Sequence, residues 1–161
     1  MPIPPRIETF LARHGARYDV VPHPASHTSI ESAELAHVPG DLLVKAVLLE
    51  DDEGVFVAVL PATRSVHLGH LGTQLNRRVR LADTGDVPRH FPDCRGGAIS
   101  PLGPAYGLRT MVDDELDGQQ EVYFEAGDHE NLVHMTASQF MALLGPAERA
   151  HFAQRERRTH R

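Results

Sequence analysis

Lys45 is the residue whose type and setting point most directly to chemistry. It is the only lysine in a chain of 161 residues that holds 15 arginines, and it lies in the apolar run Leu42–Leu49. An ammonium is a compact point charge that can meet a phosphate inside a pocket, whereas guanidinium is a planar fork. The alternative is a strand lysine whose charge reaches solvent. An unpaired ammonium among apolar residues is costly, so we expect an anionic partner or ligand here.

A second candidate is the glycine-rich loop Gly96–Gly103, which reads GGAISPLG. Glycine permits positive φ and a close approach of the backbone to a ligand, and proline stiffens such a loop. Its free N–H groups could donate to a carbonyl oxygen, or to the oxyanion that forms when that carbonyl is attacked. The spacing is that of neither a phosphate-binding loop nor a dinucleotide fingerprint. A plain connecting turn is the alternative.

His129 ends the segment Ala126-Gly127-Asp128-His129, which predicts a turn after a strand. Histidine titrates near neutral pH and could hold an ester or orient a water molecule, and a solvated turn residue is the alternative. Cys94 is the only cysteine, which excludes an internal disulfide and a Cys-x-x-Cys metal framework. We therefore expect a reducing compartment, and we favour a structural thiol over a nucleophile.

Alternating helix and strand patterns must position these residues. Thr28-Ser29-Ile30-Glu31 fits a capping box for a helix through about Val38, and Thr136-x-x-Gln139 opens a last helix. Asp51–Gly54 links two apolar runs and predicts a hairpin. Helices are also expected at 6–14 and 68–76, a helical or irregular segment at 83–92, and strands at 17–21, 42–50, 55–60, 78–82, 108–112, 121–126 and 131–135.

This order of elements predicts a single α+β domain with a mixed, largely antiparallel sheet of about seven strands surrounded by helices. We place the domain at residues 1–148 and expect an Arg-rich, mobile tail at 149–161. The N-terminus has no basic segment followed by an apolar stretch, and no apolar run reaches the roughly 20 residues of a membrane helix. A cytoplasmic protein without membrane contact is expected.

Positive charge is unevenly distributed in a chain whose formal net charge is −6. Residues 55–112 contain seven arginines against three aspartates, a balance of +4, and residues 149–161 contain five arginines against one glutamate, again +4. These two segments could bind a few phosphates of a nucleic acid, or they are ordinary surface arginines in an Arg-biased chain.

The ordered set of motifs resembles the YbaK/EbsC-like aminoacyl-tRNA deacylases, which include the editing domain of bacterial prolyl-tRNA synthetases and its free-standing relatives. The resemblance runs over roughly residues 6–144. It rests on His23-Pro24 with Thr28-Ser29, Val44-Lys45, Val59-Leu60-Pro61-Ala62, Gly97-x-x-x-Pro101, Val112-Asp113 and Val122-Tyr123-Phe124-x-Ala126-Gly127.

The resemblance implies a hydrolase that cleaves the ester bond of mischarged aminoacyl-tRNA without a cofactor or metal. It implies that Lys45 holds the terminal nucleotide, that the Gly97–Pro101 backbone fixes the aminoacyl carbonyl, and that a tRNA hydroxyl helps to activate water. We expect His129 to join this catalytic set, and whether it is catalytic or only shapes the amino-acid side of the pocket stays open. The expected substrate-binding residues are Thr28, Ser29, Ala98, Ile99 and Ser100. Relatives specialised for cysteinyl-tRNA differ at His129, so the amino acid removed stays open, as does the oligomeric state. Contact with a synthetase or the elongation machinery is a further expectation.

Two other classes of function remain open. A binding module could recognise a nucleotide or charged tRNA without hydrolysing it. A metal-dependent hydrolase could use some of the eleven histidines, since His23-x-x-x-His27 and His67-x-x-His70 have possible ligand spacings. Neither pair forms an HExxH motif, which disfavours the metal enzyme.

Overall fold

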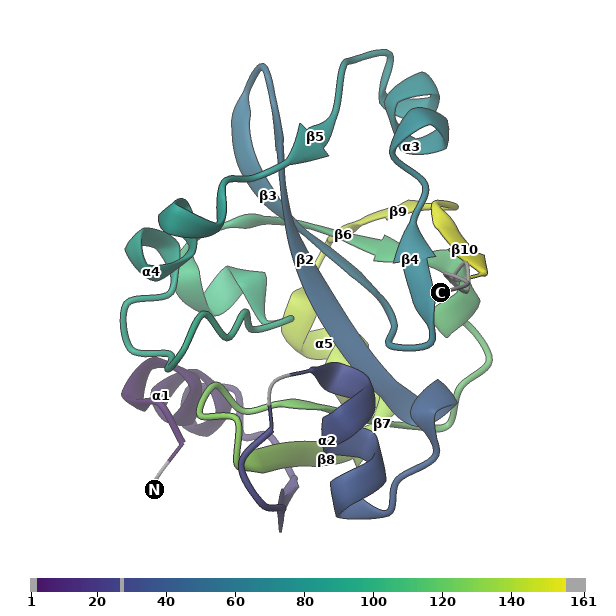
Figure 1. The fold of residues 1–161 in the computed structure, drawn as a ribbon. Coiled ribbons are helices and arrows are strands. Elements are labelled where there is room, and N and C mark those ends of the chain that lie inside the picture. The colour runs from purple at the N-terminus through teal and green to yellow at the C-terminus, as the bar shows by residue number, and fades with distance from the viewer. Residues whose placement is uncertain (1–2, 27, 156–161) are drawn as a thin grey trace, which may run out of the picture.

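A mixed β-sheet runs through the centre of the computed structural model, which describes residues 3–26 and 28–155, with the side chains of residues 29 and 30 excepted. The strands of this sheet are β1 (Asp19–Pro22), β2 (Leu43–Asp51), β3 (Gly54–Pro61), β5 (Arg80–Leu81), β6 (Arg109–Asp113), β7 (Glu121–Glu125), β8 (Asn131–Thr136) and β9 (Glu148–Ala150). Their order is β1-β8-β7-β2-β3-β6-β9, with β5 beside β2 (Figure 1). Four of the strand pairs are antiparallel and three are parallel. The predicted α+β domain with a mixed sheet is confirmed.

The hairpin of β2 and β3 is the longest pairing in the sheet, and the predicted turn at Asp51–Gly54 closes it. The carboxylate of Asp51 accepts a hydrogen bond from the backbone N–H of Glu53 at 2.8 Å, which fixes the turn. Alternate residues of β3 enter two different cores, because Val57 and Val59 face one apolar cluster while other β3 residues face the second. This explains why both strands are almost continuously apolar.

Among the described residues, five α-helices lie around the sheet: α1 (Pro5–Arg13), α2 (Ser29–Ala36), α3 (Leu68–Leu75), α4 (Val87–His90) and α5 (Ala137–Leu144). Both predicted caps are present, since the hydroxyls of Thr28 and Thr136 accept from the third backbone N–H that follows each of them. Short 3₁₀ turns lie at Gly40–Leu42, Thr84–Asp86, Gly103–Tyr106 and Asp114–Leu116. No helix in the described part of the chain has the length and apolarity to cross a bilayer.

The predicted tail is folded as far as Arg155, which corrects the domain boundary at residue 148. Strand β9 pairs with β6, and β10 (Ala153–Arg155) pairs with β4 (Arg64–Val66) in a second, two-stranded sheet. Phe152 between them is buried, and one Asp113 oxygen accepts from its N–H at 2.7 Å. These contacts hold residues 148–155 on the domain; the remainder of the expected tail, 156–161, lies outside the described residues.

Candidate active site

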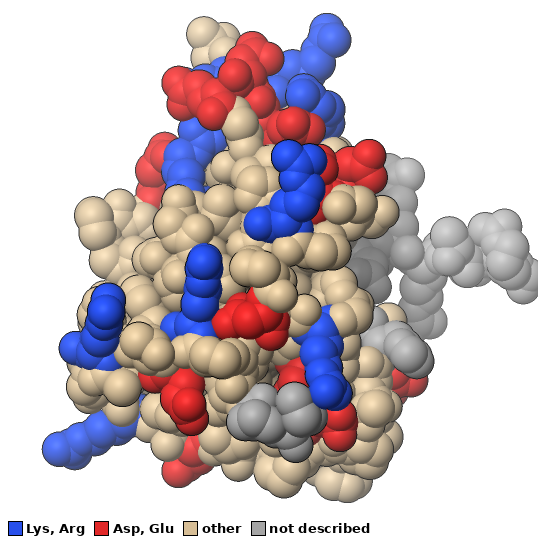
Figure 2. All heavy atoms as spheres, turned by 90° about the vertical axis from the view of Figure 1, so that its left-hand side faces the viewer, with Lys and Arg blue, Asp and Glu red and all other residues tan. Residues whose placement is uncertain are grey.

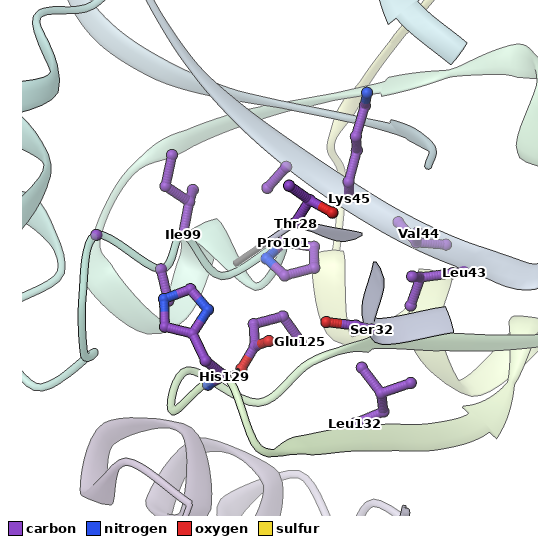
Figure 3. A pocket seen from close by; sticks show the side chains of 13 residues that line it. Thr28, Ser32, Leu43, Val44, Lys45, Ile99, Pro101, Glu125, His129 and Leu132 are labelled. Carbon is purple, nitrogen blue, oxygen red and sulfur yellow. Dashed lines mark hydrogen bonds between the residues drawn. The ribbon is translucent and has the colours of Figure 1, made fainter. Parts of the chain in front are cut away.

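Strand β2 forms one wall of a pocket of about 160 Å³. Its first residues pair in parallel with β7, which ends at the opposite wall. The sheet thus brings together segments that are about eighty residues apart in the chain. The lining residues are Thr28, Ser32, Leu43, Val44, Lys45, Ala46, Gly97, Ala98, Ile99, Pro101, Glu125, His129 and Leu132 (Figure 3).

Lys45 is half-buried on this wall. In Figure 3 its side chain runs from β2 away from His129 and Glu125, so the ammonium lies on the far side of the pocket from both. Lys45 lines the pocket, and its ammonium end points away from the histidine side of it. This direction suits contact with a part of a ligand that remains outside the small cavity.

The glycine-rich loop forms the second wall. Gly96 and Gly97 have φ angles of 54° and 78°, in the left-handed region that favours glycine. The N–H of Ala98 donates to the carbonyl of Arg95 at 2.9 Å, which closes the turn. Within the described residues the N–H groups of Gly97 and Ile99 donate to no protein acceptor. A Cβ at Gly97 would meet no atom within 4 Å, so this part of the loop borders open space.

Glu125 organises the turn that carries His129. Its Oε2 atom accepts three backbone hydrogen bonds, from the N–H groups of Gly127, Asp128 and His129, at 2.7, 2.9 and 2.9 Å. His129 consequently adopts a left-handed conformation with φ 63°, which is uncommon for a residue other than glycine. One carboxylate oxygen therefore sets the backbone of the whole turn.

His129 also links this turn to the glycine-rich loop. Its Nε2 atom lies 3.1 Å from the carbonyl oxygen of Gly96. Because a carbonyl only accepts, Nε2 carries the proton, and Nδ1 is the lone-pair nitrogen of the neutral ring. A Cβ at Gly96 would lie 3.2 Å from the imidazole, so a glycine here lets the ring approach the loop closely.

The start of α2 forms the third side of the pocket. The hydroxyl of Thr28 is used as the helix cap, and Ser32 shares a 2.5 Å hydrogen bond with the buried Ser26. The N–H of Ser26 in turn donates to the carbonyl of His129 at 3.1 Å. These bonds connect α2 to the histidine turn.

Most of the predicted site residues therefore meet around one pocket: Lys45, Gly97, Pro101, His129, Thr28, Ala98 and Ile99. Ser100 does not line it, because its side chain is fully buried and its hydroxyl accepts from the N–H of Leu102. Ser29 begins α2, and its side chain lies outside the description. Sequence reasoning did not select Glu125 or Ser32. A glutamate directly before a Gly-containing turn is the signal that could have drawn attention to Glu125.

Cys94 lies behind the histidine turn, and a Cβ on Gly127 would come within 3.0 Å of its sulfur. Burial raises the pKa of the Cys94 thiol to about 11, although a hydrogen bond with Tyr106 opposes this shift. The Tyr106 hydroxyl donates to Asp93 at 2.7 Å. A thiol with this pKa is a poor nucleophile, in keeping with the predicted structural role.

The histidine pairs considered as metal ligands have other contacts. His23 is buried and hydrogen-bonded through Nδ1 to the carbonyl of Pro24, and residue 27 lies outside the described residues. His67 uses Nδ1 to accept from the N–H of His70 as the cap of α3. Among the described residues one group, Asp113, Asp114 and His151, has metal-compatible spacing; it lies away from the pocket, and Asp113 already accepts backbone hydrogen bonds.

The arginines of residues 55–112 do not form a free basic region. Six of these seven arginines are paired with carboxylates, and many of the carboxylates come from distant segments of the chain. The six are Arg64, Arg77, Arg80, Arg89, Arg95 and Arg109. Figure 2 shows basic and acidic side chains interspersed over the face that it presents. The charge balance of the linear segment therefore overstates its capacity for phosphates.

Comparison with known proteins assigns the chain to a family. The profile of the aminoacyl-tRNA editing domain family matches residues 23–143, so the chain belongs to that family. This membership supports a deacylase role in translation fidelity, with aminoacyl-tRNA as the class of substrate. No curated protein matches the chain.

Solved structures share the fold, and three examples show how closely. One, a scaffold from computational epitope grafting, has a TM-score of 0.81 at 22% identity over 96% of this chain and 98% of its own. A protein described as hypothetical has a TM-score of 0.80 at 21% identity, and the match covers 92% of this chain and 99% of that protein. A candidate trans-editing enzyme for prolyl-tRNA synthetase has a TM-score of 0.75 at 22% identity, and the match covers 96% of this chain and 98% of that protein. At these identities the likeness concerns the fold.

Proposed function

We propose that this protein is a trans-editing hydrolase that cleaves the ester bond of mischarged aminoacyl-tRNA. The observation that carries the proposal is the meeting of Lys45, the Gly97–Pro101 loop and His129 around one pocket in a chain of the editing-domain family. The pocket is smaller than the roughly 300–1,000 Å³ of sites for drug-sized ligands, so it suits the aminoacyl end and not a whole nucleotide.

In the proposed mechanism the protein positions the ester and stabilises its oxyanion. The available N–H groups of Gly97 and Ile99 donate hydrogen bonds to the ester's carbonyl oxygen. This oxygen gains negative charge when water adds to the carbonyl carbon. The bond from that carbon to the ribose oxygen then breaks, and the ribose oxygen takes up a proton originating from the water. A hydroxyl of the tRNA helps to activate this water, and Lys45 holds the terminal nucleotide at the outer side of the pocket.

His129 shapes the aminoacyl side of the pocket in this proposal. Its ring is held by Gly96 and its backbone by Glu125, so it is a rigid boundary for the amino-acid side chain. Replacing His129 by Ala should change the ranking of the aminoacyl groups that are hydrolysed. An unchanged ranking at an unchanged rate would remove it from the site.

The experiment that tests the proposal is hydrolysis of a panel of aminoacyl-tRNAs by the purified protein, with tRNA binding followed in parallel. We expect release of one or a few amino acids well above the spontaneous rate. Binding of charged tRNA without release would instead favour the binding module, and activity that disappears with a chelator would favour a metal-dependent hydrolase. Including synthetase or elongation factor in the panel tests the expected contact with these partners.

A further inference from the structure

Among the described residues that line the pocket, Glu125 is the one with an acidic side chain. In Figure 3 its carboxylate lies between His129 and Ser32, below Pro101. A carboxylate at this position repels the phosphates of a nucleic acid, which is unfavourable in a site that must accept the end of a tRNA. Its presence calls for a role that offsets this repulsion.

The two oxygens of Glu125 have different surroundings. Oε2 accepts three backbone hydrogen bonds from the histidine turn. Oε1 accepts no hydrogen bond within the described part of the chain. It is not one of the buried polar atoms that lack a partner, so it is accessible. The turn therefore fixes the carboxylate and leaves one oxygen available to a donor that enters the pocket.

An aminoacyl ester brings such a donor. Its α-amino group is attached two bonds from the reacting carbonyl carbon, and α-amino groups with a pKa near 8 are largely protonated at pH 7. Hydrogen bonds between an ammonium and a carboxylate are among the strong ones in proteins. A preorganised oxygen also avoids the cost of ordering a flexible side chain on binding.

We propose that Glu125, through Oε1, binds the α-ammonium group of the aminoacyl moiety. This inference rests on the proposed function and names a contact for the substrate in that site. The ammonium of Lys45 and the carboxylate of Glu125 then mark opposite sides of the pocket, one for the nucleotide and one for the amino group. Together they orient the ester, and an ester without a free α-ammonium is a poor substrate.

The test compares alanyl-tRNA with lactyl-tRNA, in which a hydroxyl replaces the α-ammonium at nearly the same size. Each enzymatic rate is divided by the spontaneous hydrolysis rate of the same ester, which removes the difference in intrinsic reactivity. We expect the wild-type protein to prefer the amino ester by about 10- to 100-fold in kcat/KM, the range for one hydrogen bond to a charged group. The same pair of esters is then made for the amino acid that the protein releases fastest.

Glu125→Gln tests whether this preference comes from Glu125. The variant should lose most of its rate on the amino ester and keep its rate on the hydroxy ester, so that the ratio falls towards one. Glu130→Gln is the matched control, because Glu130 follows the same turn at the surface, about 4.0 Å from Arg95, and does not line the pocket. It should keep the wild-type ratio. Retention of the preference in Glu125→Gln would overturn the assignment.

The outcomes separate this inference from the proposed function. If the wild-type protein hydrolyses both esters with equal normalised rates, the proposed function stands and the ammonium contact is overturned. If it releases no amino acid from any charged tRNA, both are overturned. Because Oε2 holds the turn, Glu125→Gln could also fold less stably. The ratio of the two normalised ester rates in the wild-type protein does not depend on that variant, and a ratio of one would overturn the proposal.

Discussion

The two ends of strand β2 use carboxylates in opposite ways. At the hairpin end Asp51 is buried, and its oxygens are occupied by Arg109 at 2.7 Å, Arg77 at 3.3 Å and the N–H of Glu53 at 2.8 Å. At the pocket end lies Glu125, on the neighbouring strand β7. One of its oxygens accepts backbone hydrogen bonds, and the other remains available to a ligand. A fully satisfied carboxylate stabilises the fold, whereas a fixed and partly satisfied one is prepared for a ligand.

This comparison predicts a clean separation of effects. Lys45 and Asp51 lie six positions apart on one strand, roughly 20 Å at the usual rise of a strand. At the pocket end, replacing Lys45 should alter hydrolysis and leave stability nearly unchanged. Changes at the hairpin end should alter stability and leave hydrolysis nearly unchanged.

The largest effect is expected at Lys45. Lys45→Ala should reduce deacylation to the spontaneous rate, because the terminal nucleotide loses its charged contact. Lys45→Arg should fail as well, since the guanidinium fork is larger and differently hydrated. Single-turnover hydrolysis and thermal unfolding of both variants check this, and full activity in both would remove Lys45 from the mechanism.

A smaller loss of rate is expected from the glycine-rich loop. Gly97→Ala adds no steric contact but disfavours the φ of 78°, and Pro101→Ala loosens the loop. Loss of one aimed oxyanion donor costs roughly 10²–10³ in kcat, and these variants should reach that range or less. The tRNA affinity should change much less than kcat. Equal losses of affinity and rate would indicate contacts that do not distinguish the transition state.

The hairpin end should show the reverse behaviour. Asp51→Asn should cost roughly 3 kcal/mol, the low end for breaking a buried ion pair, because both arginine partners are about one third exposed. For a chain of this size that lowers Tm by about 6–12 °C. Asp52→Asn, at an exposed neighbouring carboxylate, is the control and should change little. A normal kcat/KM in both variants would confirm that the hairpin end affects stability and not hydrolysis. Loss of kcat/KM in Asp51→Asn would contradict this.

The stability from Asp51 should also depend on pH. Burial raises the pKa of Asp51, but hydrogen bonds from Arg109, the Glu53 N–H and Arg77, with the Arg109 charge, bring it below its ordinary value of 3.8. A lowered pKa in the folded state contributes stability above about pH 3.8, which is lost as pH falls through the folded value. Urea unfolding should show a constant difference between wild type and Asp51→Asn at pH 5–8 that shrinks below pH 4. A difference that persists at low pH would contradict the ion pair as its source.

The smallest effect is expected at Cys94. With a thiol pKa of about 11, against 9.0 for an ordinary thiol, alkylation at pH 8 should be about 100-fold slower in the folded protein than in the unfolded chain. Cys94→Ala should hydrolyse aminoacyl-tRNA at nearly the wild-type rate. Loss of activity in a folded Cys94→Ala protein would reopen the nucleophile that the sequence left as an alternative.

The sequence predicted the elements whose patterns are local. The β2–β3 hairpin, both threonine caps and the last helix follow from apolar runs and cap residues a few positions apart. Strands β4, β9 and β10 were missed because each has three residues without an apolar run and forms only by pairing with a distant segment. The tail prediction failed for residues 149–155 for the same reason.

The site was predicted less evenly than the fold. Lys45, the glycine-rich loop and His129 stand out by residue type, and the structure brings them to one pocket. Glu125 resembles an ordinary polar residue of an alternating strand, and its three bonds to a turn are visible only in three dimensions. The sequence left two alternatives open for the arginines of residues 55–112, because a linear count does not include partners such as Glu53, which lies 56 residues from Arg109.

The most direct test of the proposed hydrolysis is a single-turnover assay with the wild-type protein in excess over mischarged tRNA labelled on the amino acid. We predict that the label is released as free amino acid at a rate far above spontaneous hydrolysis, that the tRNA remains intact, and that Lys45→Ala abolishes the release. Stable binding of every charged tRNA in the panel with the ester intact would contradict it.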